Sequence, residues 1–489
     1  MTRGRKVKAL LLLLLPAVAV VGCAALRGLT SGFEPPGTTD PRVVELQESV
    51  RQANVVICVI DAARADHLGC YGYPRNTTPS IDRLGGESLV FTQHFCQFPH
   101  TRPSTASLFT GQHSDTHLAI GDRELPEGTP TLAEVLAREG FRTVLFSSNP
   151  NASPGMGIGL DFQETFDQSD VDPLVGGWKK LTSPEPLLRL FGNWLAENRR
   201  RRFFAYLHFD PPHQPYIQPQ WLTALFEGQQ PPPFRTGRYE FPVGDEAVLA
   251  EHEHPPLPEW INIYDANLRY ADYAVGQLEQ ELREAGVWEN TLFIVTADHG
   301  EAFGEHGYVW HGHGVYDELT HIPLLVRLPG ETNGGQRVTA LTQAIDLLPT
   351  ICELLKAPCP ETVQGRSLVP LMAGLTDHVN EYVFCRSEGE PPSYLVRNLR
   401  WAMILYGNGE WRSLYDLEAD PGQTTNVIDD FPDRAEEMLA AFREFAMTQQ
   451  RPPVDFLSPE AQALPLPPAG RIEMTPETER QLRDLGYLR

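Results

Sequence analysis

Residues Asn54–Ile60 read NVVICVI, an unbroken apolar run rich in β-branched residues that ends at Asp61. Such a run is typical of a strand buried on both faces of a parallel sheet. Other runs of this kind alternate along the chain with helical patterns, which indicates an α/β fold with a large, mainly parallel sheet flanked by helices. The predicted strands are Asn54–Ile60, Thr143–Phe146, Phe203–Phe209, Thr291–Thr296 and Ile322–Arg327, and the predicted helices are Thr131–Glu139, Leu187–Glu197 and Ile263–Gly286.

The texture of the sequence changes near its C-terminal end, where short strand patterns precede one helix. We therefore predict a large catalytic domain over residues 51–378, a smaller α+β subdomain over 379–450 and a proline-rich tail over 451–489. The proline-rich stretch 211–258 is predicted to be a long loop or lid beside the site. The predicted C-terminal elements are the strands Tyr382–Cys385, Tyr394–Arg397, Trp401–Leu405 and Trp411–Asp416 and the helix Arg434–Met447.

The N-terminus has the pattern of a secretion signal. Basic residues within MTRGRKVK precede the apolar run ALLLLLLPAVAVVG, and Val20–Cys23 resembles a bacterial lipobox. This predicts a lipoprotein-type signal peptide over residues 1–22, a lipidated Cys23 and a tether over 23–50. The alternative is a single uncleaved membrane anchor. Both predict a protein of the bacterial cell envelope or periplasm, exported and attached to a membrane.

Charge and cysteine content limit the possible partners. The formal net charge of −24 over 489 residues disfavours nucleic acid and anionic membrane surfaces. Besides Cys23 the chain has six cysteines, too few at this length for a disulfide framework. Cys352 and Cys359 could pair across a short loop.

Acidic residues and histidines follow three of the predicted buried strands. Asp61 follows the first strand, the segment 208–213 (HFDPPH) ends and follows the third, and Asp298 with His299 follows the fourth. The carboxyl ends of parallel strands meet at one edge of the sheet, where ligands bind. Carboxylates together with imidazole are ligands for a divalent cation, so we predict a metal site at this edge.

The segments around these residues resemble the sulfatase family, within the alkaline phosphatase superfamily. The resemblance runs from about Asn54 to Val427, with the motifs in the family's order, and it implies an alkaline phosphatase/sulfatase-like fold. The motifs are DAARADHLGCYGY (61–73), PSTASLFTG (103–111), DPPHQPY (210–216), TADHGEAFGEHGYVWHGHGVYDELTHIPLLVRLPG (296–330) and LYDLEADPGQTTNV (414–427).

The resemblance places Thr101 at the position of the family's nucleophile. Family members carry the pattern C/S-x-P-S-R there and oxidise its first residue to formylglycine, whereas this chain reads TRPST from Thr101 to Thr105. The known oxidation does not act on threonine. The arginine of the pattern is replaced by Thr105, and the second aspartate of the family's frequent Asp-Asp pair is replaced by Ala62.

A plain threonine changes the chemistry that is available. Formylglycine expels sulfate as its aldehyde reforms, whereas a threonine ester must be cleared by water, which phosphoryl transfer tolerates better. The set Asp61, Thr101, Asp298 and His299 resembles the metal ligands of the superfamily's phosphoryl-transferring branches. It implies one divalent ion (Ca²⁺, Mn²⁺ or Zn²⁺), and the imidazole favours Mn²⁺ or Zn²⁺. The atom of the ester that is attacked is therefore either sulfur or phosphorus.

Further roles follow from the same resemblance. His213 aligns with a histidine near the leaving group, where it would protonate the leaving oxygen or hold the anion. His311 and His313 lie near the family's sulfate-binding lysine, and each of these three histidines has a purely structural role as its alternative. A second metal bound by His208, Asp210 and a later histidine is also open.

The positive charge lost at Thr105 could be supplied by Arg64 or Arg102, which are near the motifs in the sequence. We therefore expect a metal-dependent hydrolase that cleaves a sulfate or phosphate ester of a small molecule or glycan. One alternative is a head-group phosphoryl transferase of the same superfamily. The other is a family member that binds a glycan or protein without turnover.

Overall fold

The computed structural model of the chain describes residues 40–167, 170, 183–214, 216, 219–231, 257–307, 309–389, 391–407, 411–450, 471, 472 and 474–484. From Glu45 onward the described residues belong to one compact unit, Glu45–Arg489. The predicted signal peptide, the lipobox and most of the predicted tether lie outside the described residues. Among the helices of the described part, none combines the length and apolar character needed to cross a membrane.

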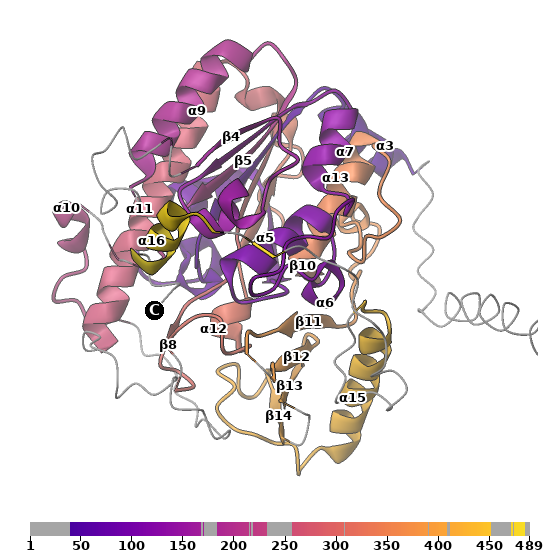
Figure 1. The fold of residues 1–489 in the computed structure, drawn as a ribbon. Helices are drawn as coiled ribbons and strands as arrows, with labels where there is room; N and C mark the ends of the chain where they lie inside the picture. The colour runs from indigo at the N-terminus through magenta and orange to yellow at the C-terminus, as the bar shows by residue number, and fades with distance from the viewer. Residues whose placement is uncertain are drawn as a thin grey trace, which may run out of the picture. The chain divides into compact units, whose positions relative to one another are not determined.

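Eight strands of the unit Glu45–Arg489 form one large mixed sheet (Figure 1). Every residue of the strands at its centre is buried, as continuous apolar runs predict. Most neighbouring strands pair in parallel, and one strand (β9) pairs antiparallel with both of its neighbours. The order across the sheet is β10 (Arg337–Gln343), β2 (Leu89–Phe95), β9 (Leu324–Arg327), β6 (Thr291–Ala297), β1 (Asn54–Ile60), β5 (Phe203–Phe209), β3 (Arg142–Ser147) and β4 (Glu164–Phe166).

The register of the central strands brings their last residues level with one another. Ile60 at the end of β1 pairs with Phe209 of β5 and with Ala297 of β6. Ser147 of β3 pairs with His208 of β5. The residues that follow these four strands therefore leave the sheet at the same edge, where the site was predicted.

Helices cover both faces of this sheet. Figure 1 shows α9 (Pro184–Asn198) and α11 (Leu257–Glu284) on one side and α7 (Leu132–Arg138) and α13 (Leu347–Leu355) on the other. The sequence predicted α7 and α9 to within three residues at each end, and it predicted α11 with a start six residues too late, at Ile263. These observations confirm the predicted fold class.

The C-terminal sheet is antiparallel and four-stranded, in the order β11 (Val383–Arg386), β12 (Tyr394–Arg397), β13 (Trp401–Tyr406) and β14 (Trp411–Asp416). Helix α15 (Pro432–Met447) packs against it through Met438, Leu439 and Phe442. The predicted strands and helix of this part are all present.

Several features differ from the sequence-based expectations, including α10 (Gln220–Thr223) within the predicted loop and α16 (Pro476–Asp484) within the predicted tail. The end of the predicted tether is helical, as α3 (Pro41–Val50). Helix α5 (Thr101–Thr110), which begins at the predicted nucleophile, was not predicted. Cys352 and Cys359 are free thiols in the structure, where a hydrogen bond joins them across the short loop and the suggested disulfide is not formed.

Candidate active site

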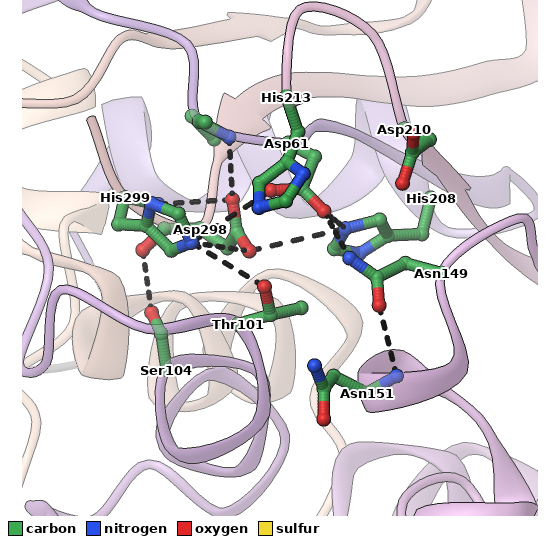
Figure 2. Close-up of polar contacts among 12 residues, drawn as sticks. Asp61, Thr101, Ser104, Asn149, Asn151, His208, Asp210, His213, Asp298 and His299 are labelled. Carbon is green, nitrogen blue, oxygen red and sulfur yellow. Dashed lines mark hydrogen bonds and ion pairs between the residues drawn. The ribbon is translucent and has the colours of Figure 1, made fainter. Parts of the chain in front are cut away.

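Three aspartates leave the ends of the central strands side by side. Asp61, Asp210 and Asp298 directly follow β1, β5 and β6, and all three are buried. The backbone N–H of Asp61 donates to the carbonyl of Phe209, which ties the ends of β1 and β5 together. Figure 2 shows the carboxylates of Asp61 and Asp298 around one centre with His299 beside them, while Asp210 lies farther out, next to His208.

The turn after Asp61 is fixed by an unusual backbone conformation. Ala62 has φ +56°, in the left-handed region that costs a non-glycine residue about 1 kcal/mol or more. In this conformation its N–H donates to Oδ1 of Asp298 at 3.1 Å. The position at which the family often carries a second aspartate therefore contributes a backbone donor here.

Thr101 enters the same centre from helix α5. It is the first residue of that helix, and its side chain has no exposed surface. Its Oγ1 lies 3.3 Å from Nε2 of His299. One turn later, Oγ of Ser104 donates to the carbonyl of Asp298 at 2.6 Å, which fixes the helix to the end of β6 (Figure 2).

The hydrogen bonds of His299 leave the nitrogen that faces Thr101 with a lone pair. Nδ1 donates to the carbonyl of Gly300 at 2.8 Å, so it carries the proton. Nε2 faces Oδ1 of Asp61 at 3.7 Å and Oδ2 of Asp298 at 3.5 Å. This histidine is therefore held in the tautomer that can bind a metal through Nε2.

The arrangement of Asp61, Asp298 and His299 fits a divalent cation. One ligand atom from each lies within 4.8 Å of the others. Oδ1 of Asp61 and Oδ2 of Asp298 are buried and accept no hydrogen bond. Buried carboxylate oxygens without donors are costly unless a cation neutralises them. Two such oxygens and an imidazole lone pair are a suitable donor set for Mn²⁺ or Zn²⁺.

The pKa values of these acids indicate the same need for positive charge. Burial raises the pKa of Asp298, Asp210 and Glu301, and the neighbouring charge of Asp61 raises all three further. Burial also opposes ionisation of Asp61, but nearby imidazoles, His213 first among them, hold its pKa below the ordinary value. Several buried carboxyl groups therefore lie together with few positive charges near them. A bound cation would lower the cost of ionising them.

Two of the predicted histidines lie against His299. The ring of His311 stacks on that of His299 with centroids 4.4 Å apart, and Nε2 of His311 lies 3.4 Å from Nε2 of His213. Nδ1 of His213 donates to the carbonyl of Gln214, so its Nε2 is unprotonated and is the acceptor in its contact with Nε2 of His311. His313 is exposed, and its link to this group is a charge interaction with His311.

His208 is bonded through both ring nitrogens. Its Nε2 donates to Oδ2 of Asp61 at 3.0 Å, and its Nδ1 accepts from the hydroxyl of Tyr206 at 2.9 Å. No lone pair is left for a metal, so His208 does not serve the second site that the sequence left open. Its role is to orient the carboxylate of Asp61.

The structure does not place either predicted arginine at the centre. The guanidinium of Arg64 bonds to Asp66 and Glu305, and it lines a separate cavity of ≈ 440 Å³. Arg102 donates to three backbone carbonyls, those of Met156, Gly121 and Arg123. Proximity in sequence was misleading because both side chains turn away from Thr101.

Arg64 is expected to stabilise the fold and not to take part in chemistry. Arg64→Met leaves Glu305 buried without its partner, which costs about 3–5 kcal/mol of unfolding free energy. Urea unfolding measures this cost, and Arg64→Met/Glu305→Gln should recover part of it. Turnover by the folded fraction should be unchanged. A loss of turnover with unchanged stability would contradict this role.

Sequence reasoning missed two asparagines that follow β3. Nδ2 of Asn149 donates to Oδ2 of Asp61, and Oδ1 of Asn149 accepts the backbone N–H of Asn151 at 2.8 Å. Both asparagines are buried. They lie two and four residues beyond the end of β3, and none of the sequence motifs contains them.

Comparison with known proteins agrees with this fold. The family description "Sulfatase" matches residues 53–357, more than half of the chain, and "N-sulphoglucosamine sulphohydrolase, C-terminal" matches residues 304–449. A Delta 4,5-hexuronate-2-O-sulfatase of Bacteroides thetaiotaomicron is 24% identical over 434 residues, which cover 78% of this chain and 86% of that protein. Arylsulfatase K of Xenopus laevis is 26% identical over 457 residues, covering 81% and 83% respectively.

A solved structure has the same fold. The phosphonate monoester hydrolase of Agrobacterium radiobacter superposes with a TM-score of 0.70 at 24% identity, covering 81% of this chain and 95% of that one. The family match rests on the sequence of the domain that carries Asp61, Thr101, Asp298 and His299. The chain therefore belongs to the sulfatase family and is a hydrolase of sulfuric or phosphoric esters.

Proposed function

We propose that this hydrolase cleaves its ester with Thr101 as the nucleophile, beside a divalent cation held by Asp61, Asp298, His299 and Thr101 itself. The observation that carries the proposal is the position of Oγ1 of Thr101, 3.3 Å from Nε2 of His299. That nitrogen faces the two carboxylate oxygens without donors at 3.7 and 3.5 Å. A cation bound there supplies Lewis-acid polarisation and lowers the pKa of the threonine hydroxyl.

The first step forms the bond between Oγ1 of Thr101 and the sulfur or phosphorus atom and breaks the bond to the leaving oxygen. The proton of the hydroxyl ends on the leaving alcohol. His213 is the side chain proposed to carry it, because its Nε2 is unprotonated and its ring lies against those of His299 and His311. His311, in contact with Nε2 of His213, would orient that ring.

The second step releases the group from Thr101. Water attacks the sulfur or phosphorus atom, the bond to Oγ1 breaks, and His213 passes the proton of the water back to Oγ1. The products are the alcohol and inorganic sulfate or phosphate, and the threonine is regenerated without an aldehyde. Sulfated or phosphorylated glycans and small molecules are the proposed substrates, and the hexuronate sulfatase among the relatives supports the glycan class.

Matched aryl esters test the proposal. Purified protein, loaded in turn with Mn²⁺, Zn²⁺ and Ca²⁺, is assayed on an aryl sulfate, a phosphate monoester, a phosphodiester and a phosphonate monoester, with Thr101→Ala as the control. We expect hydrolysis of at least one ester by the parent and none by the variant. Equal rates for the two proteins would overturn Thr101 as the nucleophile. An inactive parent that binds no metal would favour the non-catalytic alternative.

We also propose that the protein acts outside the cytoplasm, anchored through lipidated Cys23. The basic and apolar N-terminus followed by Val20–Cys23 supports this. Cys23→Ser removes the site of lipidation, so the variant should either leave the membrane fraction or keep its N-terminal segment uncleaved. Fractionation measures the first result and mass spectrometry of the N-terminus the second. An unmodified N-terminus in the parent would contradict lipidation.

A further inference from the structure

The side-chain nitrogen of Asn151 is a buried donor without an acceptor. Asn151 is 3% exposed, and its Nδ2 has no hydrogen-bond partner. A buried unbonded amide donor costs about 1–3 kcal/mol, so few proteins keep one without a reason. Any acceptor that reaches this nitrogen in the working enzyme therefore gains a hydrogen bond at little cost.

The surrounding bonds hold Asn151 in a fixed position relative to the cluster. It lies in the short helix η3 (Pro150–Ala152), whose N-cap is Asn149. Oδ1 of Asn149 accepts the N–H of Asn151, while Nδ2 of Asn149 donates to Asp61. One side chain thus connects the backbone of Asn151 with a proposed metal ligand.

Asn151 also adjoins the nucleophile. Helix η3 packs against helix α5, whose first residue is Thr101. In Figure 2 the side-chain nitrogen of Asn151 points to the Thr101 side of the cluster. Both side chains are buried, with Thr101 0% and Asn151 3% exposed, so both belong to the closed interior of the cluster.

We propose that Nδ2 of Asn151 donates a hydrogen bond to a non-bridging oxygen of the group that Thr101 attacks. This proposal rests on the proposed function of Thr101. The N-terminus of α5, a helix of 10 residues, points its partial positive charge at the same place. The amide thereby holds the anion, which is the role first expected of Arg64 or Arg102. It does so without a net charge.

Three variants test the proposal. Asn151→Ala removes the donor, and Asn151→Asp replaces it with a repelling oxygen of nearly the same shape. The matched control is Asn267→Ala, because Asn267 is equally buried but its Nδ2 donates to the carbonyl of Ile263 at 3.0 Å. All are measured as metal-loaded full chains for kcat, KM, metal content and thermal midpoint.

The expected result separates catalysis from stability. Asn151→Ala should lower kcat about 10²–10³-fold, as loss of one preorganised donor does, with unchanged metal content. Its thermal midpoint should stay equal or rise, because an unbonded buried donor is removed. Asn151→Asp should lose more activity than Asn151→Ala. Asn267→Ala should show the reverse pattern, with a lower midpoint and parental kcat.

Binding of inorganic sulfate and phosphate keeps the test separate from the proposed function. Calorimetry with these two anions requires no turnover, so it reports on Asn151 even if Thr101 is not the nucleophile. We expect weaker binding of at least one anion to Asn151→Ala than to the parent. A kcat within about twofold of the parent would overturn the proposal. So would unchanged anion binding together with a lowered thermal midpoint, because Asn151 would then be structural.

Discussion

Replacing Thr101 with alanine is expected to lower kcat by about 10⁴-fold or more on every ester that the parent cleaves. The reason is that Oγ1 of Thr101 is the hydroxyl that lies beside both His299 and the carboxylate pair. The alanine variant keeps the helix start and the buried position, so its thermal midpoint should change by little. Initial rates and a melting curve on the same preparation check both statements.

Thr101→Ser is the matched control for this prediction. Serine keeps the hydroxyl and removes one methyl group, so it should retain turnover within about two orders of magnitude of the parent. An alanine variant as active as the serine variant would show that water, or another side chain, attacks the ester directly. In that case Thr101 would only be a neighbour of the metal.

Removing the metal is expected to have the second largest effect. Chelation, or Asp298→Asn, should abolish turnover and leave less than one tightly bound divalent ion per chain. The thermal midpoint should also fall on chelation, because a ligand at about 100 times its Kd stabilises the folded state by about 2.7 kcal/mol. Metal analysis and melting curves give this readout independently of activity.

The stabilisation by metal should depend on pH in a known direction. An acid whose pKa is raised by folding stabilises the folded chain at low pH, and this contribution is lost as the pH rises toward the folded-state pKa. The pKa values of Asp298, Asp210 and Glu301 are raised by burial. The free energy of unfolding of the metal-free chain should therefore fall as the pH rises above the ordinary carboxyl range. The stabilisation gained on adding metal should grow over the same range.

Asp210→Asn is the control for the metal prediction. Asp210 is as buried as Asp298, and both of its oxygens lack donors, but it is not part of the three-residue group that surrounds one point. The variant should keep the bound ion. If Asp298→Asn still binds one ion per chain while Asp210→Asn does not, the metal site lies instead at the end of β5.

The sequence predicted the central strands because their residues are apolar on both faces, as in Asn54–Ile60 and Phe203–Phe209. It did not predict β2, whose sequence LVFTQHF mixes polar residues into the run, or α5, which is buried on every side and so lacks an apolar stripe. The residue pattern of one short segment does not show which distant segments of the chain will bury it.

The candidate site was predictable where a residue directly follows a buried strand. Asp61, Asp298 and His299 follow this rule, and strand register alone brings them together. The direction of a long side chain depends on partners elsewhere in the chain, which is why Arg64 and Arg102 were misjudged. The donors Asn149 and Asn151 gave no signal in the motifs, because an asparagine after a strand is common at turns.

Trapping the covalent intermediate tests the central claim most directly. The parent is quenched during turnover of its best ester and digested, and the peptide containing residue 101 is analysed by mass spectrometry. The account predicts a sulfo or phospho group on Oγ of Thr101 that is absent without metal. A transferred group on any other side chain, or a formylglycine-type aldehyde generated elsewhere in the site, would contradict it.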